Sequence, residues 1–166
     1  MNPLNSPPKF LLFLDFDGVL HPVRAGEHEK FRPAAIHSVN RILDELEANV
    51  VLSTAWRMDF GIEKFNAWFK DRIIDSTPVH ELNLQKKHPR FHEVMDFLKT
   101  REWLHVPWIA IDDKRTHFPT NSPAYITNAK IGLTEKDADN VILMGQSMKF
   151  AQRSLLEHIS RRGYRD

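Results

Sequence analysis

LLFLDFDGVLHP, residues 11–22, is the most informative segment of this 166-residue chain. Together with Phe10 it starts as a short apolar run, which ends where Asp15 follows Leu14. A continuous apolar run of this length is typical of a strand that is buried on both faces of a parallel sheet. The letters DFDG that follow indicate a turn. We therefore predict a strand over Phe10 to Leu14, with Asp15 at its carboxyl end.

Further strands and helices alternate along the rest of the chain. Apolar runs predict strands at residues 49–53 (NVVLS), 108–111 (WIAI) and 124–127. Helical spacing of apolar residues predicts helices at residues 33–46, 62–74, 90–103, 134–144 and 148–161. Pro33 suits the first turn of its helix, and Thr134 suits an N-cap. This alternation predicts an α/β fold: a three-layer, Rossmann-like domain with a mostly parallel central sheet and right-handed crossovers.

Length and composition narrow the classes of protein. We expect residues 1–166 to form one domain, with residues 1–8 as a loose lead-in. A net charge of +1 gives no general attraction to nucleic acid or to a membrane surface. The absence of cysteine excludes disulfides, zinc–thiolate sites and cysteine nucleophiles. No apolar run near the N-terminus is long enough for a signal peptide or a membrane span, so we expect a cytoplasmic protein. Nothing in the sequence sets its oligomeric state.

Reactive side chains stand at the ends of three predicted strands. Asp15 and Asp17 follow the first strand, Ser53 and Thr54 the second, and Asp112 and Asp113 the third. Ligands of an open parallel sheet bind beyond the carboxyl ends of its strands, so these residues should meet at one edge. Crowded carboxylates need a cation, and an oxygen-only site suits Mg²⁺. We expect this ion to be held by Asp15, by one of Asp112 and Asp113, and by the backbone near Asp17.

The residue types also predict a reaction. With Mg²⁺ neutralising a phosphoryl group, one carboxylate can attack phosphorus and a second can serve as general acid and base. A hydroxyl and a cation are still needed to hold the phosphoryl oxygens. The sequence therefore predicts a phosphohydrolase.

The motifs resemble those of the haloacid dehalogenase (HAD) superfamily. FLDFDGVL matches its first motif, an apolar strand followed by DxDG. VVLST matches its second motif and IAIDD its fourth. The resemblance implies that Asp15 is the nucleophile and Asp17 the general acid and base. It also implies a HAD-type phosphatase that hydrolyses phosphate monoesters through an aspartyl-phosphate, with Asp15, Asp17, Asp112 and Asp113 around the metal.

Two features of the motif pattern leave alternatives open. Either Ser53 or Thr54 can provide the hydroxyl that binds phosphate, and we favour Thr54. The cation of the third motif can be Arg90, Lys87 or Lys86. Arg90 is preferred, followed by Lys87, because Arg90 opens the predicted helix before the last acidic strand.

The spacing of the motifs leaves no room for a cap domain. The segments between Gly18 and Val50, and between Arg57 and Trp108, are too short for one, so we expect an open site. Such a site suits a large phosphorylated substrate, such as a nucleic-acid end or a phosphoprotein. We expect the segment from His21 to Arg32 to act as a basic flap near the phosphate, with basic side chains at Arg24, His28 and Lys30.

Later residues resemble a smaller subgroup of the superfamily, the HAD domains of some RNA-repair proteins. STAWR (53–57) follows the second strand, and IGLT (131–134) follows the paired aspartates. This resemblance suggests a polynucleotide-end phosphatase by analogy of fold. Two other functions remain open: a non-catalytic binding module with the same fold, and a phosphotransferase on the same scaffold.

Overall fold

The five strands form one parallel sheet. The structure is a computed structural model that describes residues 6–23, 31–79 and 85–162. Its sheet has the order β3-β2-β1-β4-β5, with all neighbouring strands parallel. The strands are β1 (Phe10–Leu14), β2 (Ala48–Leu52), β3 (Ile73–Ser76), β4 (Trp108–Asp112) and β5 (Ala124–Ile126). The predicted α/β fold with a mostly parallel sheet is confirmed.

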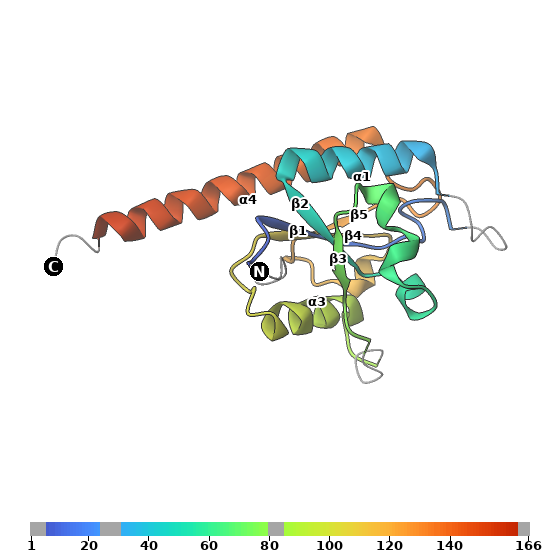
Figure 1. The fold of residues 1–166 in the computed structure, drawn as a ribbon, viewed down its shortest axis with the longest axis horizontal. Helices are drawn as coiled ribbons and strands as arrows, with labels where there is room; N and C mark the ends of the chain where they lie inside the picture. The colour runs from blue at the N-terminus through green and yellow to red at the C-terminus, as the bar shows by residue number, and fades with distance from the viewer. Residues whose placement is uncertain (1–5, 24–30, 80–84, 163–166) are drawn as a thin grey trace.

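Helices cover both faces of this sheet, which gives three layers (Figure 1). Helices α1 (Pro33–Leu46) and α4 (Glu135–Arg162) lie side by side on one face, and α3 (Pro89–Thr100) lies on the other. One apolar core lies between the sheet and the α1–α4 pair, and a second lies beneath α3. Burying both faces explains why β1, β2 and β4 are continuous apolar runs.

Strand β1 lies at the centre of the sheet, and all five of its residues are buried. Because side chains alternate along a strand, Leu12 and Leu14 join the core under α1 and α4, whereas Leu11 and Phe13 join the core under α3. The Phe13 ring packs edge-on against Phe97, at a centroid distance of 5.7 Å. The central position of β1 fixes the turn that follows it against both neighbouring strands.

The prediction of a helix over residues 62–74 is wrong. The chain there forms two short 3-10 helices, η3 (Ile62–Lys64) and η4 (Asn66–Phe69), followed by β3. Lys70 and Asp71 have positive φ angles of 54° and 56°, so the chain leaves the helical conformation after η4. Edge strand β3 then pairs with β2, so the helical spacing of the apolar side chains does not decide the structure there.

The two helices predicted over residues 134–144 and 148–161 are one continuous helix, α4. The predicted N-cap at Thr134 is confirmed, because the Thr134 hydroxyl accepts a hydrogen bond from the Asp137 amide at 3.2 Å. The distal apolar residues of α4 do not pack on the sheet. The end of α4 extends past the sheet (Figure 1), and its distal residues Phe150, Leu155, Leu156 and Ile159 are exposed.

The remaining predicted elements need smaller corrections. Strand β2 ends at Leu52 rather than at Ser53, and α3 ends at Thr100 rather than at Trp103. Between β1 and β4 the described residues build no cap domain. Most of the predicted basic flap (residues 24–30) and part of the lead-in (residues 1–5) lie outside the described residues. Among the described helices, none has the length and apolar character needed to cross a membrane.

Candidate active site

Asp15, Ser53 and Asp112 lie at the carboxyl ends of three neighbouring strands: Asp15 directly follows β1, Ser53 directly follows β2, and Asp112 is the last residue of β4. The sheet register pairs Leu14 with both Leu52 and Ile111. The ladder continues for one more residue, since the Asp15 amide donates to the Ile111 carbonyl at 3.0 Å and the Ser53 amide to the Leu14 carbonyl at 2.9 Å. The alternation of side chains then directs these three residues to the α3 face. The predicted meeting of the strand ends at one edge is confirmed.

Three carboxylates gather at this edge. Asp15, Asp112 and Asp113 each offer an oxygen, and these atoms lie within 4.8 Å of one another. Burial, and after it the charge of Asp112, raises the pKa of Asp15 to about 8. The same two causes, in the same order, raise the pKa of Asp113. A hard divalent cation fits this all-oxygen group, and it would counter the repulsion that adds to the effect of burial on both pKa values.

His117 and a backbone amide hold the carboxylate of Asp112. Nδ1 of His117 lies 2.9 Å from Oδ2 and 3.0 Å from Oδ1, and the Lys114 amide donates to Oδ1 at 2.8 Å. Such contacts orient a metal-binding carboxylate. Sequence reasoning missed His117, and no motif surrounds it that could have revealed it.

Gly18 brings the turn after β1 directly against Asp113. Its φ is +73°, and a Cβ built on it would lie 2.5 Å from Oδ2 and 2.6 Å from Cβ of Asp113. The Thr127 hydroxyl donates to the Gly18 carbonyl at 2.7 Å, and the Leu133 amide donates to the Val19 carbonyl at 2.7 Å. The loop after β5, which includes the IGLT segment, therefore holds the DFDG turn in place.

The carboxylate of Asp17 points to a different set of partners. Trp56 Nε1 donates to it, at 3.2 Å from each oxygen. His21, which is buried, places Nε2 at an ion-pair distance of 3.0 Å from Oδ1 without the angles of a hydrogen bond. The group of three carboxylate oxygens does not include Asp17. Of the four aspartates predicted around the metal, the structure gathers the other three.

The two candidate hydroxyls differ in their surroundings. Thr54 caps the 3-10 helix η2 (Ala55–Met58), because its Oγ1 accepts from the Trp56 amide at 3.4 Å. The buried Ser53 Oγ has no hydrogen-bond partner among the described residues. Ser53 also lies beside Asp15 in the register. The free hydroxyl at this edge is therefore that of Ser53, although the sequence led us to favour Thr54.

Two arginines share one buried carboxylate behind Asp15. Arg57 Nη2 donates to Glu93 Oε2 at 2.9 Å, and Arg90 Nη1 donates to the same oxygen at 3.2 Å. The positive charge of Arg90 lowers the pKa of Asp15, against the larger effects of burial and Asp112. The alternative cations Lys86 and Lys87 are both exposed. Among the three candidates, Arg90 is the one with a charge interaction with Asp15.

Arg57 fastens the short helix η2 to its surroundings. Its Nε donates to the Thr77 carbonyl at 3.0 Å, and its Nη1 donates to the Thr54 carbonyl. Burial, followed by the charge of Arg90, lowers the pKa of Arg57, whereas Glu93 and Asp15 oppose that shift. Arg57 and Glu93 thus join β2, β3 and α3 beneath the carboxylates. The sequence pattern STAWR did not reveal this contact with Glu93.

Comparison with known proteins identifies the family. The model of a family described as "HAD domain in Swiss Army Knife RNA repair proteins" matches residues 11–138, from β1 into α4. A search of the curated proteins finds no match. The family match covers the DFDG turn, both hydroxyls, Arg57, Arg90 and the paired aspartates. The chain therefore belongs to the HAD domains of Swiss Army Knife RNA repair proteins.

Proposed function

We propose that this protein hydrolyses phosphate monoesters through an aspartyl-phosphate on Asp15, with Mg²⁺ bound among Asp15, Asp112 and Asp113. The main support is the group of three carboxylate oxygens at the carboxyl ends of β1 and β4. The order of the strands reverses between β1 and β4, and such a point is where α/β sheets bind ligands. Membership of a HAD family supports a phosphatase-type activity.

The proposed reaction has two steps. An oxygen of Asp15 attacks phosphorus, the bond from phosphorus to the leaving oxygen breaks, and that oxygen takes a proton from Asp17. Asp17 then takes a proton from water, whose oxygen attacks phosphorus. The bond between phosphorus and Asp15 breaks, which releases inorganic phosphate and restores the carboxylate. Bound Mg²⁺ would neutralise the charge between the phosphoryl group and the carboxylates.

Other side chains have proposed roles around the phosphoryl group. The Ser53 hydroxyl, free and beside Asp15, donates to a phosphoryl oxygen. Arg90 supplies the positive charge, and Glu93 holds its guanidinium in place. His117 orients Asp112 for the metal. Trp56 holds Asp17 where it can reach the leaving oxygen.

The proposed substrate is a large phosphorylated molecule, of which a polynucleotide end is the leading candidate. Two observations support it. The described residues build no cap domain over the carboxylates, and a site without a cap would admit a bulky group. The matched family is named for RNA-repair proteins.

Phosphatase assays on matched variants test this proposal. Purified protein with Mg²⁺ should release phosphate from p-nitrophenyl phosphate, and a chelator should stop the release. Asp15→Asn should lower kcat at least about a hundredfold, because it removes the nucleophile. Asp139→Asn, which changes an exposed aspartate on α4 that pairs with Arg41, serves as the control with unchanged turnover. Magnesium binding without turnover would instead support a non-catalytic binding module.

A further inference from the structure

A continuous set of aromatic rings extends from Asp17 to the protein surface. Trp56, which donates to Asp17, packs on Phe31 at a centroid distance of 5.5 Å and on Phe60 at 6.1 Å. Phe31 in turn packs on Trp68 at 6.1 Å. We call Phe31, Trp56, Phe60 and Trp68 the aromatic surface. Phe60 is 40% exposed and Trp68 is 51% exposed, so this surface reaches solvent.

The exposure of these rings is not required by the core beneath them. Phe16 and Phe65 are buried there, at a centroid distance of 5.0 Å, and both belong to the core. Phe60 and Trp68 lie outside that layer. Clustered exposed aromatic side chains next to a site usually mark a binding surface.

The aromatic surface lies on the side of the site from which the product alcohol leaves. In the proposed reaction Asp17 gives its proton to the leaving oxygen, so that oxygen must come within hydrogen-bond distance of Asp17. The group attached to this oxygen must then lie beside Trp56, which contacts the same carboxylate. The part of the substrate that carries the phosphate therefore faces the aromatic surface.

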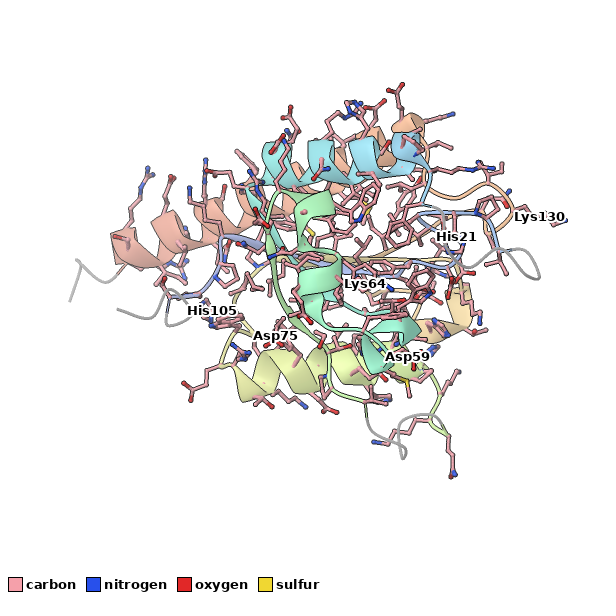
Figure 2. All side chains as sticks on the ribbon, turned by 45° about the vertical axis from the view of Figure 1, so that its right-hand side comes forward. His21, Asp59, Lys64, Asp75, His105 and Lys130 are labelled. Atoms are coloured by element: carbon pink, nitrogen blue, oxygen red, sulfur yellow. The ribbon has the colours of Figure 1, made fainter. Side chains whose placement is uncertain are left out.

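A positive charge accompanies the rings. Nζ of Lys64 lies 3.2 Å from the centroid of Phe60, which is the geometry of a cation–π contact. Figure 2 shows Lys64, the last residue of η3, and Asp59, which follows η2, in front of the sheet. Exposed aromatic faces next to a lysine are the combination with which proteins stack nucleic-acid bases and hold the backbone. A phosphoserine side chain offers no flat ring for such a surface.

We propose that the aromatic surface stacks the base of the nucleotide whose terminal phosphate is removed. This inference rests on the proposed phosphatase function and assigns its substrate class: a single-stranded polynucleotide end. Phe60 and Trp68 provide exposed aromatic side chains, Trp56 connects these rings to Asp17, and Lys64, over one face of Phe60, provides the charge for a backbone phosphate.

A cycle that changes both protein and substrate tests the stacking directly. One substrate is a short single-stranded oligonucleotide with a terminal phosphate, and the other lacks only the base of the phosphorylated nucleotide. Both ends, 3′ and 5′, are tested, and the end that the wild type hydrolyses faster is used. Removing the base should lower kcat/KM of the wild type about tenfold, which is within the range for loss of one stacked base. In Phe60→Ala and Trp68→Ala, the same change of substrate should lower kcat/KM less than about threefold.

Phe150→Ala is the matched control. Phe150 is 73% exposed, but it lies on the distal part of α4, so this variant should keep the whole effect of removing the base. The proposal is wrong if removing the base has no effect on the wild type, or the same effect in all variants. Faster turnover of a phosphoserine peptide than of the oligonucleotide would also overturn it.

Equilibrium binding separates this proposal from the proposed function. Fluorescence anisotropy of labelled oligonucleotides with Asp15→Asn protein requires no turnover. The intact end should bind about tenfold more tightly than the end without its base, and Trp68→Ala added to Asp15→Asn should reduce that ratio. If the ratio is present but no ester is hydrolysed by the wild type, only the phosphatase proposal fails. If hydrolysis depends on Asp15 but the ratio is absent, only the stacking proposal fails.

Discussion

Gly18 is the residue that lets the turn after β1 approach the paired aspartates. Its φ of +73° is unfavourable for other residues, and any Cβ there would overlap Asp113. Gly18→Ala should therefore lower the free energy of unfolding by about 1–3 kcal/mol and weaken Mg²⁺ binding. Urea unfolding and calorimetric titration with Mg²⁺ measure these two effects.

Gly61→Ala is the control for that substitution. Gly61 has a φ of −74°, and the atoms nearest to a Cβ there belong to the carboxylate of Glu63, which can rotate away. We expect this control to change both quantities little. Magnesium affinity of Gly18→Ala equal to that of the wild type would show that the turn does not hold Asp113.

Glu93 is a buried anion that balances two arginines. Glu93→Gln removes the charge that pairs directly with the buried guanidinium of Arg57, which should lower the free energy of unfolding by about 3–5 kcal/mol. Asp44→Asn is the comparison, because Asp44 pairs with Lys70 and Arg72 at the surface. Surface pairs of this kind contribute about 0–1 kcal/mol. Similar losses in urea unfolding for both variants would contradict this assignment.

Single residues were predictable where strand order alone places them. Asp15, Asp112 and Asp113 could be predicted because parallel strands bring their carboxyl ends to one edge. The choice between Ser53 and Thr54 depended on where β2 ends. Successive residues of a strand point to opposite faces of the sheet, so only one of these two side chains can lie on the same face as Asp15. His117 reaches Asp112 through a 3-10 turn, η5 (Arg115–His117), which has no sequence signal.

Two secondary-structure predictions were wrong because they relied on local sequence patterns. Phe65, Trp68, Phe69 and Ile73 have helical spacing, but Ile73 belongs to β3 and Trp68 belongs to the exposed aromatic surface. The predicted break near Gly145 is also absent. A Cβ at Gly145 would overlap the side chain of Leu46, so this glycine permits α1 and α4 to lie close together. Its role is in packing, which the sequence of one helix cannot reveal.

The distal part of α4 should contribute little to stability. Leu155 is exposed beyond the sheet, so Leu155→Ala should change the free energy of unfolding by less than about 0.5 kcal/mol. Leu43, which is fully buried between α1 and the sheet, is the comparison, and Leu43→Ala should cost about 2–5 kcal/mol. Urea unfolding of both variants measures the difference. A large loss in Leu155→Ala would mean that this part of α4 is packed against another surface in solution.

The whole molecule concentrates negative charge at one edge of its sheet. The core residues of β1, β2 and β4 fix the positions of the strand ends, so the carboxylates of Asp15 and Asp112 cannot move apart without disturbing the core. Burial and mutual repulsion then raise the pKa of Asp15 to about 8, from an ordinary value of 3.8. The stability of the folded protein must therefore depend on pH and on cations.

The sign of this dependence follows from the protons that each state binds. Between about pH 4 and pH 8 the folded state keeps a proton on Asp15 that the unfolded chain has lost, so stability decreases as pH rises through this range. Asp15→Asn removes the contribution of this proton to the pH dependence of stability. In a chelator, this variant should be more stable than the wild type at pH 8, and the difference should shrink toward pH 5.

Magnesium should reverse the effect, because a cation bound to the three carboxylates favours their ionised form. Urea unfolding from pH 5 to pH 8, with Mg²⁺ and with chelator, measures both dependences. Asp139→Asn again serves as the control, since its pairing with Arg41 lies on the surface. If the wild type without Mg²⁺ instead gains stability over Asp15→Asn as pH rises, Asp15 is ionised without a cation. The three carboxylates would then coexist without a metal, which would contradict a magnesium site held among them.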